Sequence, residues 1–108
     1  MSSPIVIGDD LSMPVQLYKG GIEFAIPGTA DVQAAIVDRD RTEVLAGPVT
    51  CLEAATGADW STSLIIADFP ESESADITAG LVYLEIQVDD NGKNTWFVSL
   101  AAVQGNIP

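Results

Sequence analysis

The residues best suited to chemistry in this 108-residue chain are carboxylates that occur in close pairs. The pairs are Asp9-Asp10, Asp38 with Asp40, and Asp89-Asp90. Two neighbouring carboxylates can divide the roles of general acid and base, as in glycosidases. Each pair here adjoins turn residues, however, and Asp stabilises turns by bonding to the backbone. The chain also has no histidine, the usual general base near neutral pH. We therefore expect no catalytic residues and interpret the protein as a non-enzyme.

A single cysteine and an acidic turn are the other features that resemble reactive or metal-binding sites. Cys51 is the single cysteine, so it cannot form an internal disulfide, and its apolar neighbours at 49–52 favour a buried structural thiol. Asp89-Asp90-Asn91-Gly92 begins like a calcium loop, but the twelfth position is Leu100, where an EF-hand needs glutamate. We expect a hairpin turn there. No metal or cofactor site is predicted, although weak calcium binding by other acidic loops stays open.

The charge balance limits the partners. Sixteen acidic and four basic residues give a formal net charge of −12. Nucleic-acid binding needs Lys and Arg for the phosphates, and an anionic membrane repels such a chain, so we expect neither partner. No apolar run reaches the roughly 20 residues that span a bilayer, and no signal peptide is recognised. The charge is consistent with simple solubility or with a basic partner surface.

The most informative pattern for the fold lies at 81–103. Two alternating apolar rows, one before and one after a turn, consist of Val82, Leu84, Ile86 and Val88, then Trp96, Val98, Leu100 and Ala102. A two-residue Asn91-Gly92 loop would set Ile86 opposite Phe97. A three-residue loop that includes Asp90 sets Ile86 opposite Trp96 and joins both rows into one. It also places Gly92 where the turn needs a left-handed residue, so we predict a hairpin in this register.

Shorter apolar segments between turn signals are candidates for the remaining strands. They lie at 4–7, 12–18, 22–26, 31–38, 43–46 and 49–54, and a strong strand lies within 60–69. Pro14 suggests a strand start or an edge. The apolar run at 64–67 suggests burial on both faces, and 71–78 has room for one helical turn. Seven to eight strands at this spacing predict an all-β sandwich or barrel.

Four aromatic residues are candidates for contact with a partner. Tyr18, Tyr83 and Phe97 fall on the faces opposite the predicted core of their strands. We favour packing for Phe97, as if a second sheet covered it, and leave Tyr18 and Tyr83 open between packing and partner contact. Trp60 begins a strand and is interpreted either as a core residue or as an exposed anchor. Tyr18, Trp60 and Tyr83 are therefore the predicted contact residues, since aromatic side chains dominate interface hot spots.

The order of several motifs resembles a known family. A short strand ends in Ile7-Gly8-Asp9-Asp10, Gln16-Leu17-Tyr18-Lys19-Gly20-Gly21 follows, and Ala34-Ala35-Ile36-Val37-Asp38 comes next. Ala79-Gly80 then leads through the alternating strand and the Asp-Asn-Gly turn to Thr95-Trp96. This order is similar to the amino-terminal domain of the phage baseplate upper protein family and to small Ig-like virion proteins. The segment 39–63 carries no part of the resemblance.

The resemblance implies both a fold and a role. The fold would be a single domain over 1–108, an Ig-like antiparallel β-sandwich of seven to eight strands with a C-terminal hairpin. The role would be a structural or adaptor protein of a bacteriophage particle, at the tail, baseplate, neck or fibre attachment. It would be made in the host cytoplasm, reside in the virion, contact other virion proteins and occur in several copies around a symmetry axis. The alternatives are a capsid decoration protein, or a carbohydrate- or protein-binding module outside phages.

Overall fold

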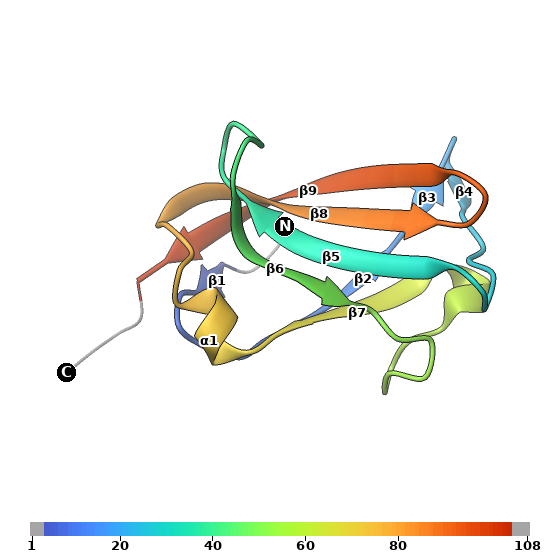
Figure 1. The fold of residues 1–108 in the computed structure, drawn as a ribbon, viewed down its shortest axis with the longest axis horizontal. Helices are drawn as coiled ribbons and strands as arrows, with labels where there is room; N and C mark the ends of the chain where they lie inside the picture. Colours follow the sequence, from blue (N-terminus) through green and yellow to red (C-terminus); the bar gives the residue numbers. More distant parts are fainter. Residues whose placement is uncertain (1–3, 105–108) are drawn as a thin grey trace.

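The computed structural model describes residues 4–104, and most of its regular elements are β-strands (Figure 1). The elements are β1 (Ile5–Val6), β2 (Leu11–Gln16), β3 (Tyr18–Lys19), β4 (Ile22–Glu23), β5 (Asp31–Val37), β6 (Val44–Thr50), η1 (Trp60–Thr62), β7 (Leu64–Phe69), α1 (Glu71–Ser74), β8 (Gly80–Asp89) and β9 (Lys93–Val103). The all-β sandwich predicted from the sequence is confirmed. The Ig-like topology stays a prediction.

The strands form two layers and a small ribbon. The larger layer is a five-stranded sheet in the order β1-β9-β8-β5-β6. The second layer is the antiparallel pair β2–β7, which crosses behind the sheet in Figure 1. The ribbon β3–β4 lies near the hairpin end of β9, where the Trp96 indole N–H donates to the Tyr18 carbonyl at 2.9 Å. The second layer therefore has fewer strands than the sheet that it covers.

One edge of the sheet departs from the antiparallel prediction. β1 pairs with β9 in parallel, with Ile5 opposite Ala102 and Val6 opposite Val103. After β1 the chain turns at Gly8 and continues in the other layer as β2, so it never runs back along β9. The other sheet pairings are antiparallel.

The C-terminal hairpin has the predicted register. Ile86 lies opposite Trp96, and Asp89 opposite Lys93, across the three-residue loop. Gly92 has positive φ as predicted, at 147°, and Asn91 before it is also left-handed, with φ 58°. Asparagine tolerates this conformation because its short polar side chain can bond locally.

The core lies between the two layers. The predicted inward row of β8, Val82 to Val88, is buried at alternate positions, and Ala34 and Ile36 of β5 lie beside it. From the second layer Ile65, Ala67 and Phe69 face them. The packing explains the sequence pattern, because alternate side chains of a strand point to the same face.

Three strand predictions need correction. The segments predicted at 43–46 and 49–54 form one strand, β6, because positive φ at Gly47 and register shifts against β5 carry it through Gly47-Pro48. The run at 64–67 is not buried on both faces: Ile65 and Ala67 are buried, whereas Leu64 and Ile66 are half-buried. The reason is that β7 has a sheet packed on only one side.

The third correction, and one confirmation, concern short elements. The strand predicted at 22–26 is paired only over Ile22–Glu23. The helical turn predicted within 71–78 is confirmed as α1. No helix in residues 4–104 is long and apolar enough to cross a membrane.

A candidate protein-contact face on the five-stranded sheet

The outer face of the five-stranded sheet, which points away from β2–β7, carries an aromatic pair. Tyr83 of β8 and Phe97 of β9 lie diagonally across the two strands, since Glu85 is the residue opposite Phe97. Their ring centroids are 6.4 Å apart with an interplanar angle of 87°. This edge-to-face geometry is a favoured one for aromatic rings. Phe97 is 41% exposed and Tyr83 is half-buried, so the pair is accessible from solvent.

Arg41 covers the aromatic pair from the loop between β5 and β6. Its guanidinium carbon lies 4.8 Å from the Phe97 ring centroid and 5.2 Å from that of Tyr83. A guanidinium at this distance is attracted by the negative face of the ring. We call Arg41, Tyr83 and Phe97 the aromatic–arginine cluster. Its members come from a loop and two strands, so the fold of the sheet assembles it.

Asp38 fixes the loop that presents Arg41. Its carboxylate accepts hydrogen bonds from the Thr42 backbone N–H at 2.7 Å and the Thr42 hydroxyl at 3.0 Å. The backbone carbonyl of Asp38 accepts a hydrogen bond from the backbone N–H of Arg41 at 2.9 Å. The Thr42 N–H, with other bonds from the loop, holds the pKa of the Asp38 carboxyl below its ordinary value. Arg41 itself has φ 59°, which shows how tightly the chain turns here.

Apolar side chains extend the cluster across the sheet. Val37 of β5 lies opposite Tyr83 on one side and opposite Val44 of β6 on the other. Val44 is 51% exposed and Leu81, two residues before Tyr83, is 45% exposed. An exposed apolar surface rimmed by polar residues is typical of a protein-contact site.

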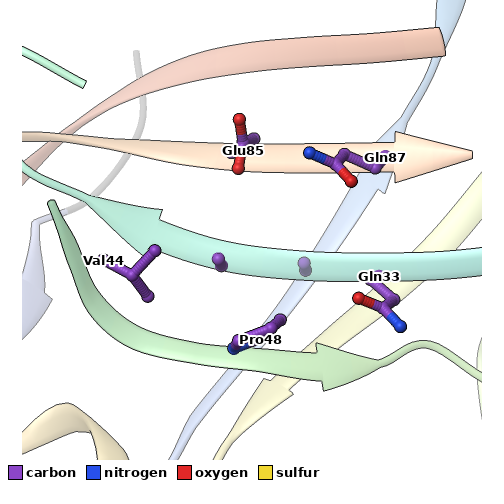
Figure 2. Close-up of a pocket in the computed structure, with 7 residues that line it drawn as sticks. Gln33, Val44, Pro48, Glu85 and Gln87 are labelled. Carbon is purple, nitrogen blue, oxygen red and sulfur yellow. The ribbon is translucent and has the colours of Figure 1, made fainter. Parts of the chain in front are cut away.

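A shallow depression adjoins the cluster (Figure 2). Its volume is about 220 Å³, and it is lined by Gln33, Ala34, Ala35, Val44, Pro48, Glu85 and Gln87. It exists because Ala35 is short while its neighbours across the strands, among them Glu85, are long. The amide and carboxylate groups of the walls can exchange hydrogen bonds with a partner, and Glu85 also links the depression to Phe97.

The structure does not bring the three predicted contact residues together. Tyr83 belongs to the aromatic–arginine cluster. Tyr18 is 51% exposed but lies on β3, away from that face, with its carbonyl bonded to Trp96. Trp60 is only 5% exposed and packs in the core, so the interpretation of Trp60 as an exposed anchor is wrong. Its position explains this, because η1 leads directly into the buried strand β7.

Sequence reasoning missed two members of the cluster. The sequence predicts that a second sheet covers Phe97, but within residues 4–104 the second layer lies on the opposite side of β9. The predicted register already placed Phe97 on the same face as Tyr83, and that signal pointed to the pair. Arg41 carried no such signal, because its contact depends on how the loop at 38–43 bends back over the sheet.

The described residues offer little for metal or thiol chemistry. Within residues 4–104 no three His, Cys, Asp or Glu side chains are grouped as a metal site would need. Cys51 is buried as predicted, and burial, with the Asp68 charge adding to it, raises its pKa to about 11. Such a thiol stays protonated at neutral pH. Comparison of the chain with protein-family models, curated proteins and solved structures gave no match.

Proposed function

We propose that this protein is a structural or adaptor protein of a bacteriophage particle, acting by protein–protein contact. The observation that carries the proposal is the aromatic–arginine cluster on the outer face of the sheet. The resemblance of the motif order to phage baseplate and small Ig-like virion proteins supplies the biological setting. A rigid β domain with one accessible face suits a position at the tail, baseplate, neck or fibre attachment.

The composition of the cluster favours contact with another protein. Tyr and Arg are enriched among the interface residues that contribute most to binding, and aromatic residues generally gather at the centre of interfaces. The bonds of Asp38 hold Arg41 in place before binding, so less side-chain freedom is lost when a partner docks. With a net charge of −12, the chain as a whole favours a partner with a basic surface.

Repeated copies are part of the proposal. Particles present identical subunits around symmetry axes, so an adaptor at such a position is expected in several copies. A capsid decoration protein, clamping neighbouring shell subunits, would use the same face and remains the second reading within the virion. A carbohydrate-binding site would need exposed aromatic side chains, and Trp60, which could have been one of them, is buried.

The first test asks whether the protein is in the particle. Particles of the phage or prophage that encodes the chain are purified and analysed by quantitative mass spectrometry. We expect the protein at a fixed ratio to a known tail or capsid protein. Its absence from purified particles would overturn the proposal, as would an operon for sugar utilisation around its gene.

The second test asks whether the cluster makes the contact. A phage lacking the gene is complemented with the Arg41→Ser/Phe97→Ser double variant or with Thr95→Ser, an exposed change on the same strand. We expect the double variant to fold but to be lost from particles, and Thr95→Ser to be incorporated as the wild type is. Normal incorporation of the double variant would exclude this face as the contact.

A further inference from the structure

The two layers leave a groove open along one side of the molecule. Because the second layer has only two strands, it does not cover the inward side chains of β8 and β9 completely. A groove of about 510 Å³ lies there, lined mainly by Met13 and Val15 of β2, Leu84 of β8, Val98 and Leu100 of β9, and Ile5 of β1. The lining is largely apolar, and Met13, Val15 and Val98 are only half-buried.

Within residues 4–104, no strand pairs with most of the β9 edge beside this groove. Among these residues β1 pairs with Ala102 and Val103 of a strand that begins at Lys93. The Val103 carbonyl accepts from the Ile7 N–H at 3.0 Å, so the backbone groups of Val103 face β1. These groups alternate in direction along a strand, and the register with β8 is unbroken. The N–H and C=O groups of Thr95, Phe97 and Ser99 therefore face the same, open edge.

β1 shows how a strand at this edge uses the groove. Ile5 pairs with the end of β9 and points its side chain inward, where it lines the groove and is 7% exposed. A longer strand in the line of β1 would place every second side chain against Val98 and Met13. The edge of β2, in the second layer, is less suitable for strand addition. Leu17 N–H donates to Ser63, so by alternation Pro14 faces outward, where it has no N–H to offer.

We propose that the β9 edge and the adjoining groove bind an extended segment of another protein by strand addition. The segment would have apolar side chains at alternate positions and basic residues at its flanks. The alternation follows from the apolar groove on one side of the added strand. The basic flanks follow from charge: no Lys or Arg lines the groove, and Asp9 and Asp10 line a second hollow that shares Ile5 and Met13 with it.

A second copy of this chain is the less suitable occupant. Each copy carries a charge of −12, so two β9 edges that meet would also bring together two strongly acidic molecules. In a β9–β9 pair, moreover, the inward side chains of the added strand would already be packed in the core of their own molecule and could not fill the groove. The proposed site uses the backbone edge of β9 and the inward groove, whereas the aromatic–arginine cluster uses the outward side chain of Phe97. The proposal does not depend on the virion assignment.

Hydrogen exchange of the full chain tests this with synthetic peptides. The probe has about nine residues, alternating valine and threonine between terminal lysines, which spans the open edge at about 3.3 Å per residue. The comparison peptide has glutamate in place of lysine. We expect the lysine peptide to bind more tightly and to slow exchange of the Thr95, Phe97 and Ser99 amides. The Trp96 and Val98 amides, already paired with β8, should change little.

Two variants at one position separate strand addition from other binding. Ser99→Pro removes an N–H that faces the open edge, and edge strands tolerate proline there. Ser99→Ala keeps the N–H. We expect Ser99→Pro to weaken binding of the lysine peptide by at least about tenfold and Ser99→Ala to leave it nearly unchanged. Circular dichroism checks that both variants fold.

Three results would overturn the proposal. The first is a lysine peptide that fails to protect Thr95, Phe97 and Ser99 at millimolar concentration, or that binds Ser99→Pro as well as the wild type. The second is full protection of these amides in the free, dilute chain, which would mean that the edge is already occupied. The third is protection that rises with protein concentration alone, which would identify a second copy as the occupant.

Discussion

At the scale of single residues, Ser63 is in an unfavourable environment. It is fully buried, its hydroxyl has no hydrogen-bond partner in the described part of the chain, and its φ is 71°. It ends η1, where its backbone N–H donates to the Trp60 carbonyl. A left-handed non-glycine residue costs about 1 kcal/mol, and an unpaired buried hydroxyl costs a similar amount. The backbone turn that leads into β7 therefore reduces the stability of the fold.

Replacing Ser63 by glycine should relieve both costs. We expect Ser63→Gly to raise the free energy of unfolding by about 1 kcal/mol, because glycine adopts positive φ freely and brings no hydroxyl. Urea denaturation measures the difference. Ser63→Ala is the matched control: it removes the hydroxyl but keeps the backbone strain, so it should gain less. A glycine variant less stable than the alanine variant would contradict the argument.

Cys51 offers a second prediction at this scale. Burial raises the pKa of its thiol from 9.0 to about 11, so the folded state holds the proton more tightly than the unfolded state does. Stability from this group is present below pH 9 and is lost as the pH rises toward about 11. Urea denaturation between these pH values should show a decrease that Cys51→Ala lacks. Equal pH dependence in both proteins would show that the thiol does not contribute.

At the scale of elements, the sequence predicted best where alternation was strict. The register of β8 and β9 followed from a single requirement, that Ile86 and Trp96 share one apolar row. β6 was wrongly divided because Gly47 and Pro48 are turn residues by type, and only pairing with β5 keeps them in a strand. For the ribbon β3–β4, the sequence predicted the position but not the length of the paired segments. Its packing depends on a tertiary contact, the 5.1 Å edge-to-face pair of Phe24 and Trp96.

The loop from Asp38 to Glu43 gives a prediction for an element. Asp38→Asn replaces the charged acceptor of the Thr42 N–H, so the loop should loosen and Arg41 should leave the rings of Tyr83 and Phe97. NMR measures this as loss of the upfield ring-current shift of the Arg41 side-chain protons. Acid should act in the same direction: the lowered pKa of Asp38 means that its contribution is present above pH 3.8 and lost as the pH falls.

A control near the hairpin tests whether the effect is local. Asp90→Asn lies at the far end of the sheet, in the loop between β8 and β9, and should leave the Arg41 shifts unchanged. Arg41 shifts that survive in Asp38→Asn would mean that the aromatic rings, rather than the loop, determine where the guanidinium lies.

At the scale of the whole molecule, the candidate face could be predicted only in part. The register placed Tyr83 and Phe97 on one side of the sheet, but their exposure depends on which face of the sheet the second layer covers. The position of that layer is set by long-range pairing, such as Leu11 with Phe69, which no local pattern reveals. The groove beside β9 has the same origin, because it exists only where two strands face five.

The net charge gives a prediction for the molecule as a whole. With 16 acidic and four basic residues, like charges are held closer together in the folded chain than in the unfolded one, and their repulsion lowers stability. Salt should therefore stabilise the fold. Raising NaCl from about 0.01 M to about 1 M shortens the screening length from about 30 Å to about 3 Å. We expect a higher urea midpoint in salt, and a smaller salt effect after exposed Asp40→Asn and Asp76→Asn changes.

KCl in place of NaCl should act equally, since screening does not depend on the cation. A midpoint that falls with added salt would show that attractive ion pairs, rather than repulsion, dominate the electrostatics.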